Sequence, residues 1–303
     1  MTDPSADKQL RLATALLFTY LLPGLASATN PLPAVANPMH EVCHLLATQI
    51  LSPEASDIEV GQHGCVVKNG KVAAPRYGFW IFDSAQLSGE YAAGSDPYPA
   101  IPSRGSIRVE GVRFIFGKLP ANDYLSKVQQ APLTLQLLYY WDGGTKRLKI
   151  DHAVVFSDQL GMFSLSASLL LGFGPTLAGL AEPQERPAAV EEVSFKLDNK
   201  GLFEMYAMGP VVSSVGYGVD PEPVIETWKD HHIKMLDLVP PEIAPASTAD
   251  AMKRFIADVP HPKGVTELSL RFMQPMSVVQ LVLGDMSLAE IFGRARVEGS
   301  YQP

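Results

Sequence analysis

The sequence predicts a β-dominated α+β fold, in which a curved antiparallel meander carries C-terminal helices on one face. Apolar and polar residues alternate over much of the stretch from residue 107 to residue 301, as in strands with one buried face. Short turn sequences separate neighbouring strands. Two segments with helical spacing follow each other between residues 222 and 259, which argues against a parallel βαβ arrangement.

The clearest strands lie between residues 133 and 172. Apolar residues alternate over 133–141, over 148–156 after an Asp142-Gly143-Gly144 turn, and over 163–171, where serines occupy the intervening positions. Connections this short predict an antiparallel meander with one apolar face. We expect that face to line any binding site for a hydrophobic ligand, through Leu135, Leu137, Tyr139, Ile150, His152, Val154, Phe163 and Leu165.

His152 is the polar member of this set. Its position between Ile150 and Val154 predicts a core histidine with a hydrogen-bond partner. The alternative is a polar group that contacts a ligand inside an apolar cavity.

Two shorter patterns predict local backbone geometry. From Ile107 to Phe116 the apolar positions change from odd to even numbers at Gly111, which predicts a β-bulge. The Asn69-Gly70 pair lies between residues 65–68 and 71–72, and predicts the turn of a β-hairpin.

The remaining elements follow from periodicity, proline and glycine. We expect a linker over 174–191. The expected helices span 39–51, 222–236 and 248–259, with a short helix that starts at Pro275 and another over 286–292. The expected further strands span 77–82, 193–197, 268–272 and 294–301.

Residues 1–28 have the features of a cleaved Sec-type signal peptide. Lys8 and Arg11 form a short basic region, an apolar run spans 12–22, and Ala26-Ser27-Ala28 provides small residues before a cleavage site. The alternative is an uncleaved membrane anchor, although the run is short for a bilayer span. We expect a periplasmic or secreted protein with no transmembrane span after cleavage.

The only two cysteines are Cys43 and Cys65. Because export places them in an oxidising compartment, we expect a disulfide between them, and the alternative is a pair of buried thiols. The chain that remains, 29–303, is long enough for a single β-rich domain. An N-terminal lobe over 39–130 and a C-terminal lobe over 131–303 form the alternative division.

The formal net charge is −8 at pH 7. This sign disfavours nucleic acid, and also anionic lipid head groups, as partners of the whole surface. The expected partner is a lipid or another hydrophobic small molecule, or a protein of the cell envelope. The sequence does not indicate an oligomeric state.

Residues 130–303 resemble a group of bacterial envelope proteins. The matching features are the "DGGTKRLKIDHAVV" strand pair, the serine-leucine strand, the "VEEVSFKLDNKGLFE" unit, the proline-bounded helices and the closing "LSLRFMQPMSV…LAEIFG" unit. In this order they are similar to proteins of the AsmA and YdgA groups. The resemblance implies a long curved sheet that shelters acyl chains or packs helices, and a role in envelope integrity. It implies no catalytic residues.

The string His40-Glu41-Val42-Cys43-His44 matches the HExxH pattern of zinc peptidases. On a helix, His40 and His44 would lie one turn apart, where both can bind zinc, and Glu41 would lie where it can activate a bound water. A third ligand is needed, and His63 is the best candidate because a Cys43–Cys65 disulfide brings it close. The alternative is a surface helix with two solvated histidines, and no cofactor.

A second histidine pair, His231 and His232, lies on a predicted helix. Adjacent residues point about 100° apart, so we expect one ring near the apolar side and the other in solvent. The sequence contains no glycine-rich phosphate loop, no GxSxG and no CxxC. We therefore rank a non-enzymatic envelope protein first, ahead of a zinc-dependent hydrolase and of a pure protein-interaction module.

Overall fold

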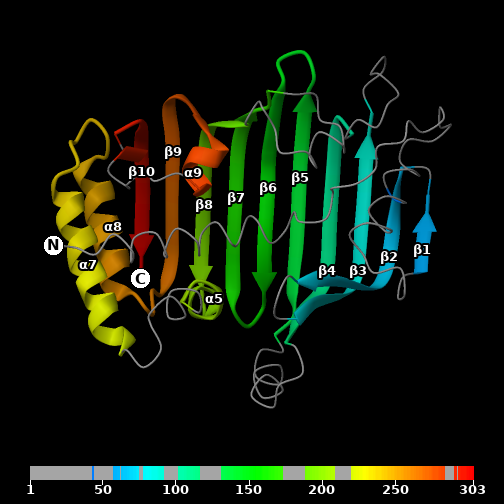
Figure 1. Cartoon of the computed structure of the whole chain (residues 1–303), viewed down its shortest axis with the longest axis horizontal. Helices are drawn as coiled ribbons and strands as arrows, with labels where there is room; N and C mark the ends of the chain where they lie inside the picture. The colour runs from blue at the N-terminus through cyan, green and yellow to red at the C-terminus, as the bar shows by residue number, and fades with distance from the viewer. Residues whose placement is uncertain are drawn as a thin grey trace. The chain divides into compact units, whose positions relative to one another are not determined.

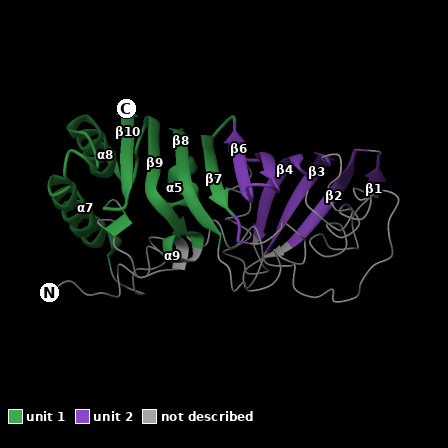
Figure 2. Ribbon diagram, turned by 90° about the horizontal axis from the view of Figure 1, so that it is seen from above, with its two compact units in different colours: residues 1–21, 158–170, 187–303 green, residues 22–157, 171–186 purple. Residues whose placement is uncertain are grey.

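The computed structural model describes residues 43, 57–61, 63–74, 78–91, 102–116, 131–172, 188–208, 220–283, 290–291 and 293–303. These residues form ten antiparallel strands and several helices (Figure 1). In the sequence, the two longest helices come after β8 and before β9. The β-dominated α+β fold with an antiparallel meander is therefore confirmed. The chain divides into two compact units, which are described separately (Figure 2).

Unit 2 is an antiparallel meander of six strands in chain order. Residues that pair directly across antiparallel strands point to the same face, so the register separates an apolar face from a polar one. The strands are β1 (Asp57–Val60), β2 (Gly64–Ala74), β3 (Gly78–Glu90), β4 (Arg104–Phe116), β5 (Leu133–Asp142) and β6 (Arg147–Ser157). We call the side of Val67, Phe82, Val112, Leu133 and Tyr139 the unit 2 apolar face; all five are buried.

The bulge predicted in β4 is confirmed. The register with β5 shifts between Val109 and Val112, and Gly111 has a φ of +69°. A positive φ is costly for residues with a Cβ atom, which explains the glycine. The extra residue moves the apolar set from odd to even positions.

The hairpin predicted at Asn69-Gly70 is wrong, because β2 continues through both residues and pairs with β3 on either side of them. Asn69 has a φ of +53°. This positive φ belongs to a β-bulge and not to a turn. Because the bulge inserts one residue into β2, the apolar face of the strand contains Val67 and then Gly70, three residues later instead of two.

The bulges of three neighbouring strands lie side by side. On the apolar face the register places Val67 beside Ala85 and Gly70 beside Phe82, so β3 also has an extra residue in this interval. Arg113 joins two of the bulges. Its Nη2 donates to Asp83 Oδ1 at 2.7 Å and Oδ2 at 2.8 Å, and its Nε donates to the Gly111 carbonyl at 3.2 Å.

Two aromatic side chains of unit 2 pack over glycine backbone. A Cβ atom on Gly70 would lie 1.8 Å from the Phe82 ring, and one on Gly105 would lie 2.4 Å from the Tyr139 ring. Each glycine pairs directly with its aromatic residue across the strands. The glycines therefore leave the space that these large rings need in order to lie flat on the sheet.

Unit 1 contains the other four strands and the helices. Its elements are β7 (Gly161–Leu170), β8 (Ala189–Asn199), α5 (Leu202–Tyr206), α7 (Pro221–Asp237), α8 (Ala246–Asp258), β9 (Gly264–Ser277), α9 (Val278–Leu283) and β10 (Ala295–Gln302). The strand order is β7-β8-β9-β10, all antiparallel. Helices α7 and α8 confirm the predicted helices 222–236 and 248–259. The predicted strand 294–301 corresponds to β10.

The core of unit 1 lies between the sheet and the two long helices. Val297 of β10 faces Leu270 of β9, and both pack with Leu236 of α7 and Ile256 of α8. Val297 is 1% exposed. Burying such side chains contributes about 1.5–3 kcal/mol each, which offsets the cost of ordering the helices.

The helices also complete the outer edge of β10. The Gly299 amide donates to Thr248 Oγ1 at 3.0 Å, and the Val297 amide donates to the Ile243 carbonyl at 2.8 Å. Edge strands otherwise present unpaired backbone groups that recruit other chains. This edge is therefore occupied by the protein's own α8 and the turn before it.

The structure differs from the predicted elements in three further ways. Pro275 lies within β9, and the helix expected to start there begins at Val278 as α9. Helix α5 was not predicted, because five residues are too few to show a helical period. Strand β8 begins at Ala189, inside the predicted linker.

Replacing Gly111 with alanine tests the aligned bulges. A Cβ atom there would lie 1.9 Å from Asp83 Oδ2, at a φ that L-residues avoid. We expect Gly111→Ala to lower the free energy of unfolding by about 1–2 kcal/mol, measured by urea titration. Gly143→Ala is the matched control, since its Cβ would meet nothing closer than 3.5 Å. Equal stability of both variants would contradict this interpretation.

Candidate ligand-binding face

The structure brings four of the predicted ligand residues together on the unit 2 apolar face. Leu135, Leu137 and Tyr139 alternate along β5, as predicted. Ile150 of β6 pairs directly with Tyr139. On the β4 side, Val109 pairs with Leu135 and thus joins the same surface. The result is a continuous aliphatic strip that ends at a tyrosine.

Two other predicted members, His152 and Val154, lie on the opposite face. The β5–β6 register shifts between the Leu138–His152 pair and the Tyr139–Ile150 pair, so Asp151 is an extra residue in β6. One inserted residue reverses the direction of every later side chain in the strand. The prediction that Ile150, His152 and Val154 share one face is therefore wrong.

His152 is exposed, so the prediction of a core histidine is also wrong. It pairs with Leu138, whose side chain is on the polar face of the sheet. Val154 is buried on that same face, beside Gln136. The unit 2 apolar face instead receives Ala153 and Val155 from this part of β6.

The last two predicted residues, Phe163 and Leu165, belong to β7 of unit 1. They pair with Leu197 and Phe195 of β8. Phe195 packs against the core that α7 and α8 cover. These two residues therefore lie on the apolar face of unit 1.

Tyr139 is the polar group of the unit 2 apolar face. Its ring lies over Gly105 and is 8% exposed. Burial, with a smaller contribution from Tyr91, raises the pKa of the Tyr139 hydroxyl. The phenol therefore stays neutral at physiological pH and is available to a ligand as a hydrogen-bond donor or acceptor.

The predicted disulfide is confirmed: Cys43 and Cys65 are bonded, with a Cα–Cα distance of 6.1 Å. Cys43 is helical and fully buried, and Leu87 and Tyr91 pack against the bridge. Cys65 lies on the unit 2 apolar face, because it pairs with Leu87. The bridge thus attaches the Cys43 segment to this end of the sheet.

The other residues of the HExxH string, His40, Glu41 and His44, lie outside the described residues. The predicted third ligand, His63, is exposed just before β2, and its carbonyl accepts a hydrogen bond from the Gly89 amide at 3.0 Å. Within the described part of the chain, no group of three or more His, Cys, Asp or Glu residues is placed to hold a metal ion.

The second histidine pair is placed as predicted. His232 is buried, and its Nδ1 lies 2.8 Å from the Trp228 carbonyl on α7. His231 is exposed. Only one ring of the pair thus belongs to the core, as expected for neighbours on a helix.

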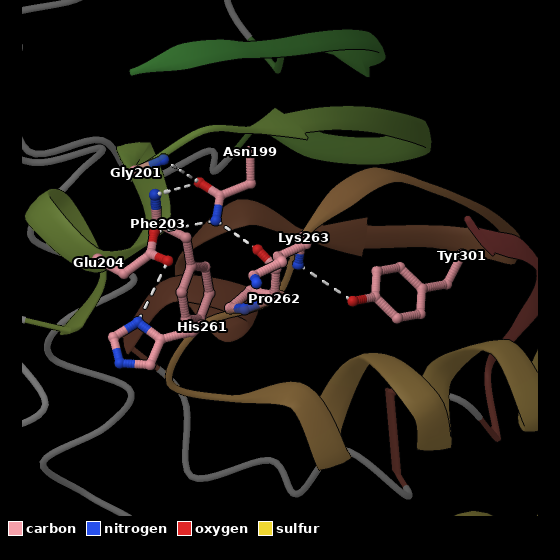
Figure 3. Close-up of polar contacts among 8 residues, drawn as sticks. All are labelled: Asn199, Gly201, Phe203, Glu204, His261, Pro262, Lys263 and Tyr301. Atoms are coloured by element: carbon pink, nitrogen blue, oxygen red, sulfur yellow. Dashed lines mark hydrogen bonds and ion pairs between the residues drawn. The ribbon is translucent and has the colours of Figure 1, made fainter. Parts of the chain in front are cut away.

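A polar cluster in unit 1 was not predicted (Figure 3). Asn199 is buried at the end of β8, and both the nitrogen and the oxygen of its side-chain amide form hydrogen bonds. Its Nδ2 donates to Glu204 at 2.9 Å and to the Pro262 carbonyl at 2.5 Å, and its Oδ1 accepts from the Gly201 and Phe203 amides. Asn199 therefore caps α5 and ties it to the turn before β9.

The same turn is held from the other side by Tyr301 of β10. Its hydroxyl donates to Asp258 Oδ2 at 2.5 Å and accepts from the Lys263 amide at 3.1 Å. His261 is 71% exposed, with Nδ1 at 3.4 Å from Glu204 Oε1. The described contacts in the cluster join its side chains to one another or to backbone groups of α5 and of the turn before β9. We therefore assign it to stability and not to chemistry.

A shallow depression lies on the outer side of α8, lined by Ser247, Asp250, Lys253 and Arg254. Lys253 bridges to Asp237 of α7 at 2.5 Å, and this hydrogen bond raises the pKa of the lysine. The depression is open to solvent, and all four residues that line it are polar or charged. Its charges join α7 to α8, so it is a poor candidate for a ligand site.

Comparisons with known proteins do not assign a family. No protein-family model matches the chain, and the curated proteins contain no significant match. The resemblance to the AsmA and YdgA groups stays a prediction. None of the described helices is long and apolar enough to cross a bilayer. The disulfide fits a protein that folds in an oxidising compartment.

Removing the disulfide should reduce stability measurably. The bridge joins residues separated by 22 positions, and a loop of this length restricts the unfolded chain by about 3 kcal/mol. We expect the Cys43→Ser/Cys65→Ser variant to lose about that much free energy of unfolding, measured by urea titration. Wild-type protein in reducing agent is the control and should match the variant. An unchanged midpoint in both samples would refute the role of the bridge.

Proposed function

We propose that the chain is a non-enzymatic protein of the cell envelope that binds a lipid or another hydrophobic ligand on the unit 2 apolar face. The observation that carries this proposal is a difference between the strands of the two units. In unit 1, α7 and α8 pack on the apolar face. In unit 2, Leu135 and Leu137 of the apolar face stay partly exposed.

The size of the face fits an acyl chain. Apolar side chains occupy alternate positions of β5 from Leu133 to Trp141, which at about 3.4 Å per residue extends for about 27 Å. One leaflet of the hydrocarbon core of a bilayer is about 15 Å thick, so an extended acyl chain fits along the strip. The neutral Tyr139 hydroxyl near one end suits the polar end of such a ligand.

Two other features of the chain support the proposed location in the envelope. The disulfide supports an oxidising compartment, and the predicted signal peptide over 1–28 supplies the route. The predicted resemblance to envelope proteins agrees with both.

Adjacent leucines of β5 allow a matched test of ligand binding. Leu135 and Leu137 point to the unit 2 apolar face, whereas Leu138 points to the polar face. We expect lipid to co-purify with the periplasmic protein in native mass spectrometry. Leu135→Ala/Leu137→Ala should weaken binding of a fluorescent fatty acid roughly tenfold or more, because two leucine contacts are lost. Leu138→Ala should leave it unchanged.

The outcomes separate the candidate functions. If folded wild-type protein carries no lipid and binds neither the fatty acid nor a hydrophobic dye, ligand binding is excluded and an interaction module becomes the better explanation. Circular dichroism of each variant confirms that weaker binding does not result from unfolding.

The confirmed disulfide is the observation that favours a second candidate function, a zinc-dependent hydrolase. The bridge links Cys43, inside the HExxH string, to a residue two positions after His63. His40, His44 and His63 would hold the zinc, and Glu41 would activate the water.

Metal analysis of protein purified without a histidine tag distinguishes this candidate. A zinc enzyme would contain about one zinc ion per chain and would lose it in His44→Ala. His261→Ala, which removes an exposed histidine elsewhere, is the control. From the ranking above we expect no stoichiometric zinc in the wild-type protein. Zinc that depends on His44 would reverse the ranking.

A further inference from the structure

The unit 2 apolar face carries no charged side chain among the described residues of β1 to β6. On β4, Ile107 and Val109 lie on this face. The charged residues that alternate with them, Arg104, Arg108 and Glu110, point to the opposite face. Outside the bulges, the register of the other strands places every described Asp, Glu, Lys and Arg on that opposite face as well. The surface is therefore uncharged as well as apolar.

The carboxylates at the bulges keep the same separation. Asp83, within the bulge of β3, accepts two hydrogen bonds from Arg113. Asp151, the extra residue of β6, bonds Lys149 at 2.8 Å. Both cations lie on the opposite face by their strand pairing. Each bulge thus holds its carboxylate with a partner on the charged side of the sheet.

The Tyr139 hydroxyl has no hydrogen-bond partner among the described residues. The side chain is 8% exposed. Burial, with a smaller contribution from Tyr91, raises the pKa of this hydroxyl, so the phenol keeps its proton. A buried hydroxyl without a partner is unfavourable, and a ligand that supplies an acceptor removes this cost.

The Tyr139 hydroxyl lies over glycine backbone. A Cβ atom on Gly105 would lie 2.4 Å from the hydroxyl oxygen. Gly105 pairs with Gly89 of β3, so two neighbouring strands carry no side chain at this level. No side chain of either glycine position therefore separates the hydroxyl from a ligand on the face.

We propose that the ligand of the unit 2 apolar face is an uncharged lipid, a long-chain alcohol or acyl ester whose oxygen accepts a hydrogen bond from Tyr139. This inference rests on the proposed function and names its ligand class. A carboxylate would be buried against an uncharged surface with no cation to pair with it, which is costly. A hydroxyl or ester carbonyl accepts the phenol proton without that cost. An ionised fatty acid is therefore the poorer ligand.

Displacement of diphenylhexatriene, a fluorescent dye without polar atoms, tests this selection. We expect the purified protein to bind the dye. Dodecanol and methyl dodecanoate should displace it at concentrations about tenfold or more below that of dodecanoate at about pH 8, where the carboxyl is ionised. Dodecanoate should compete better as the pH falls toward the pKa of its carboxyl, because the protonated acid is uncharged. Dodecanol has no such group and should show no such change.

Conservative variants of two adjacent tyrosines test the hydrogen bond. Tyr139→Phe should weaken binding of dodecanol about fivefold, because one hydrogen bond in apolar surroundings is lost. Binding of the dye, which has no acceptor, should change much less. Tyr140→Phe is the matched control, since Tyr140 is 47% exposed on the opposite face and should bind dodecanol like the wild type. Circular dichroism checks that both variants are folded.

The possible results separate this inference from the proposed function. A folded protein that does not bind the dye would overturn the proposed function, and this inference with it. If the dye binds but dodecanoate competes as well as dodecanol at about pH 8, the selection for an uncharged ligand is wrong and the proposed function stands. If dodecanol binds Tyr139→Phe as tightly as the wild type, the role of the hydroxyl is wrong.

Discussion

Side chains alternate between the two faces of an extended strand, and one inserted residue reverses every side chain that follows it. Most of the functional argument for this protein depends on that constraint. The bulge near Gly111 keeps the apolar residues of β4 on one face of the sheet. The bulge at Asp151 does the reverse, since it divides the apolar residues of β6 between the two faces. Unit 2 thus has a partly exposed apolar surface on one side, while Val154 and Phe156 lie on the other side.

The two units solve the same burial problem differently. In unit 1, α7 and α8 pack on the apolar face of the strands. Val297, one of the most buried residues of this unit, packs with residues of both helices and of β9. Polar side chains of this unit, such as Asn199 and Tyr301, form hydrogen bonds within the helix cap and the turn that they hold (Figure 3). Unit 2 instead uses aromatic rings over glycines and one disulfide, and its strands keep more accessible apolar surface. For this reason the proposed ligand-binding face lies in unit 2.

Periodicity made most elements predictable. The strands of 133–172, the two long helices and the final strand were all visible as repeating apolar positions, and the Gly111 bulge was visible as a change of phase. The Asp151 bulge was hidden, because residues 153–156 are all apolar and either phase buries a suitable set. The hairpin predicted at Asn69-Gly70 was wrong because a hairpin turn and a β-bulge both favour residues that adopt a positive φ. The Asn199 cluster depends on residues far apart in the chain, which no local pattern reveals.

The aligned bulges in β2, β3 and β4 have an evolutionary consequence. Each strand keeps its buried face only while its extra residue stays level with those of its neighbours. A single deletion in β3, for example, would leave its far half out of phase with both β2 and β4. Homologous proteins that change length at this level are therefore expected to change it in all three strands together, so gaps in an alignment would occur there as a matched set.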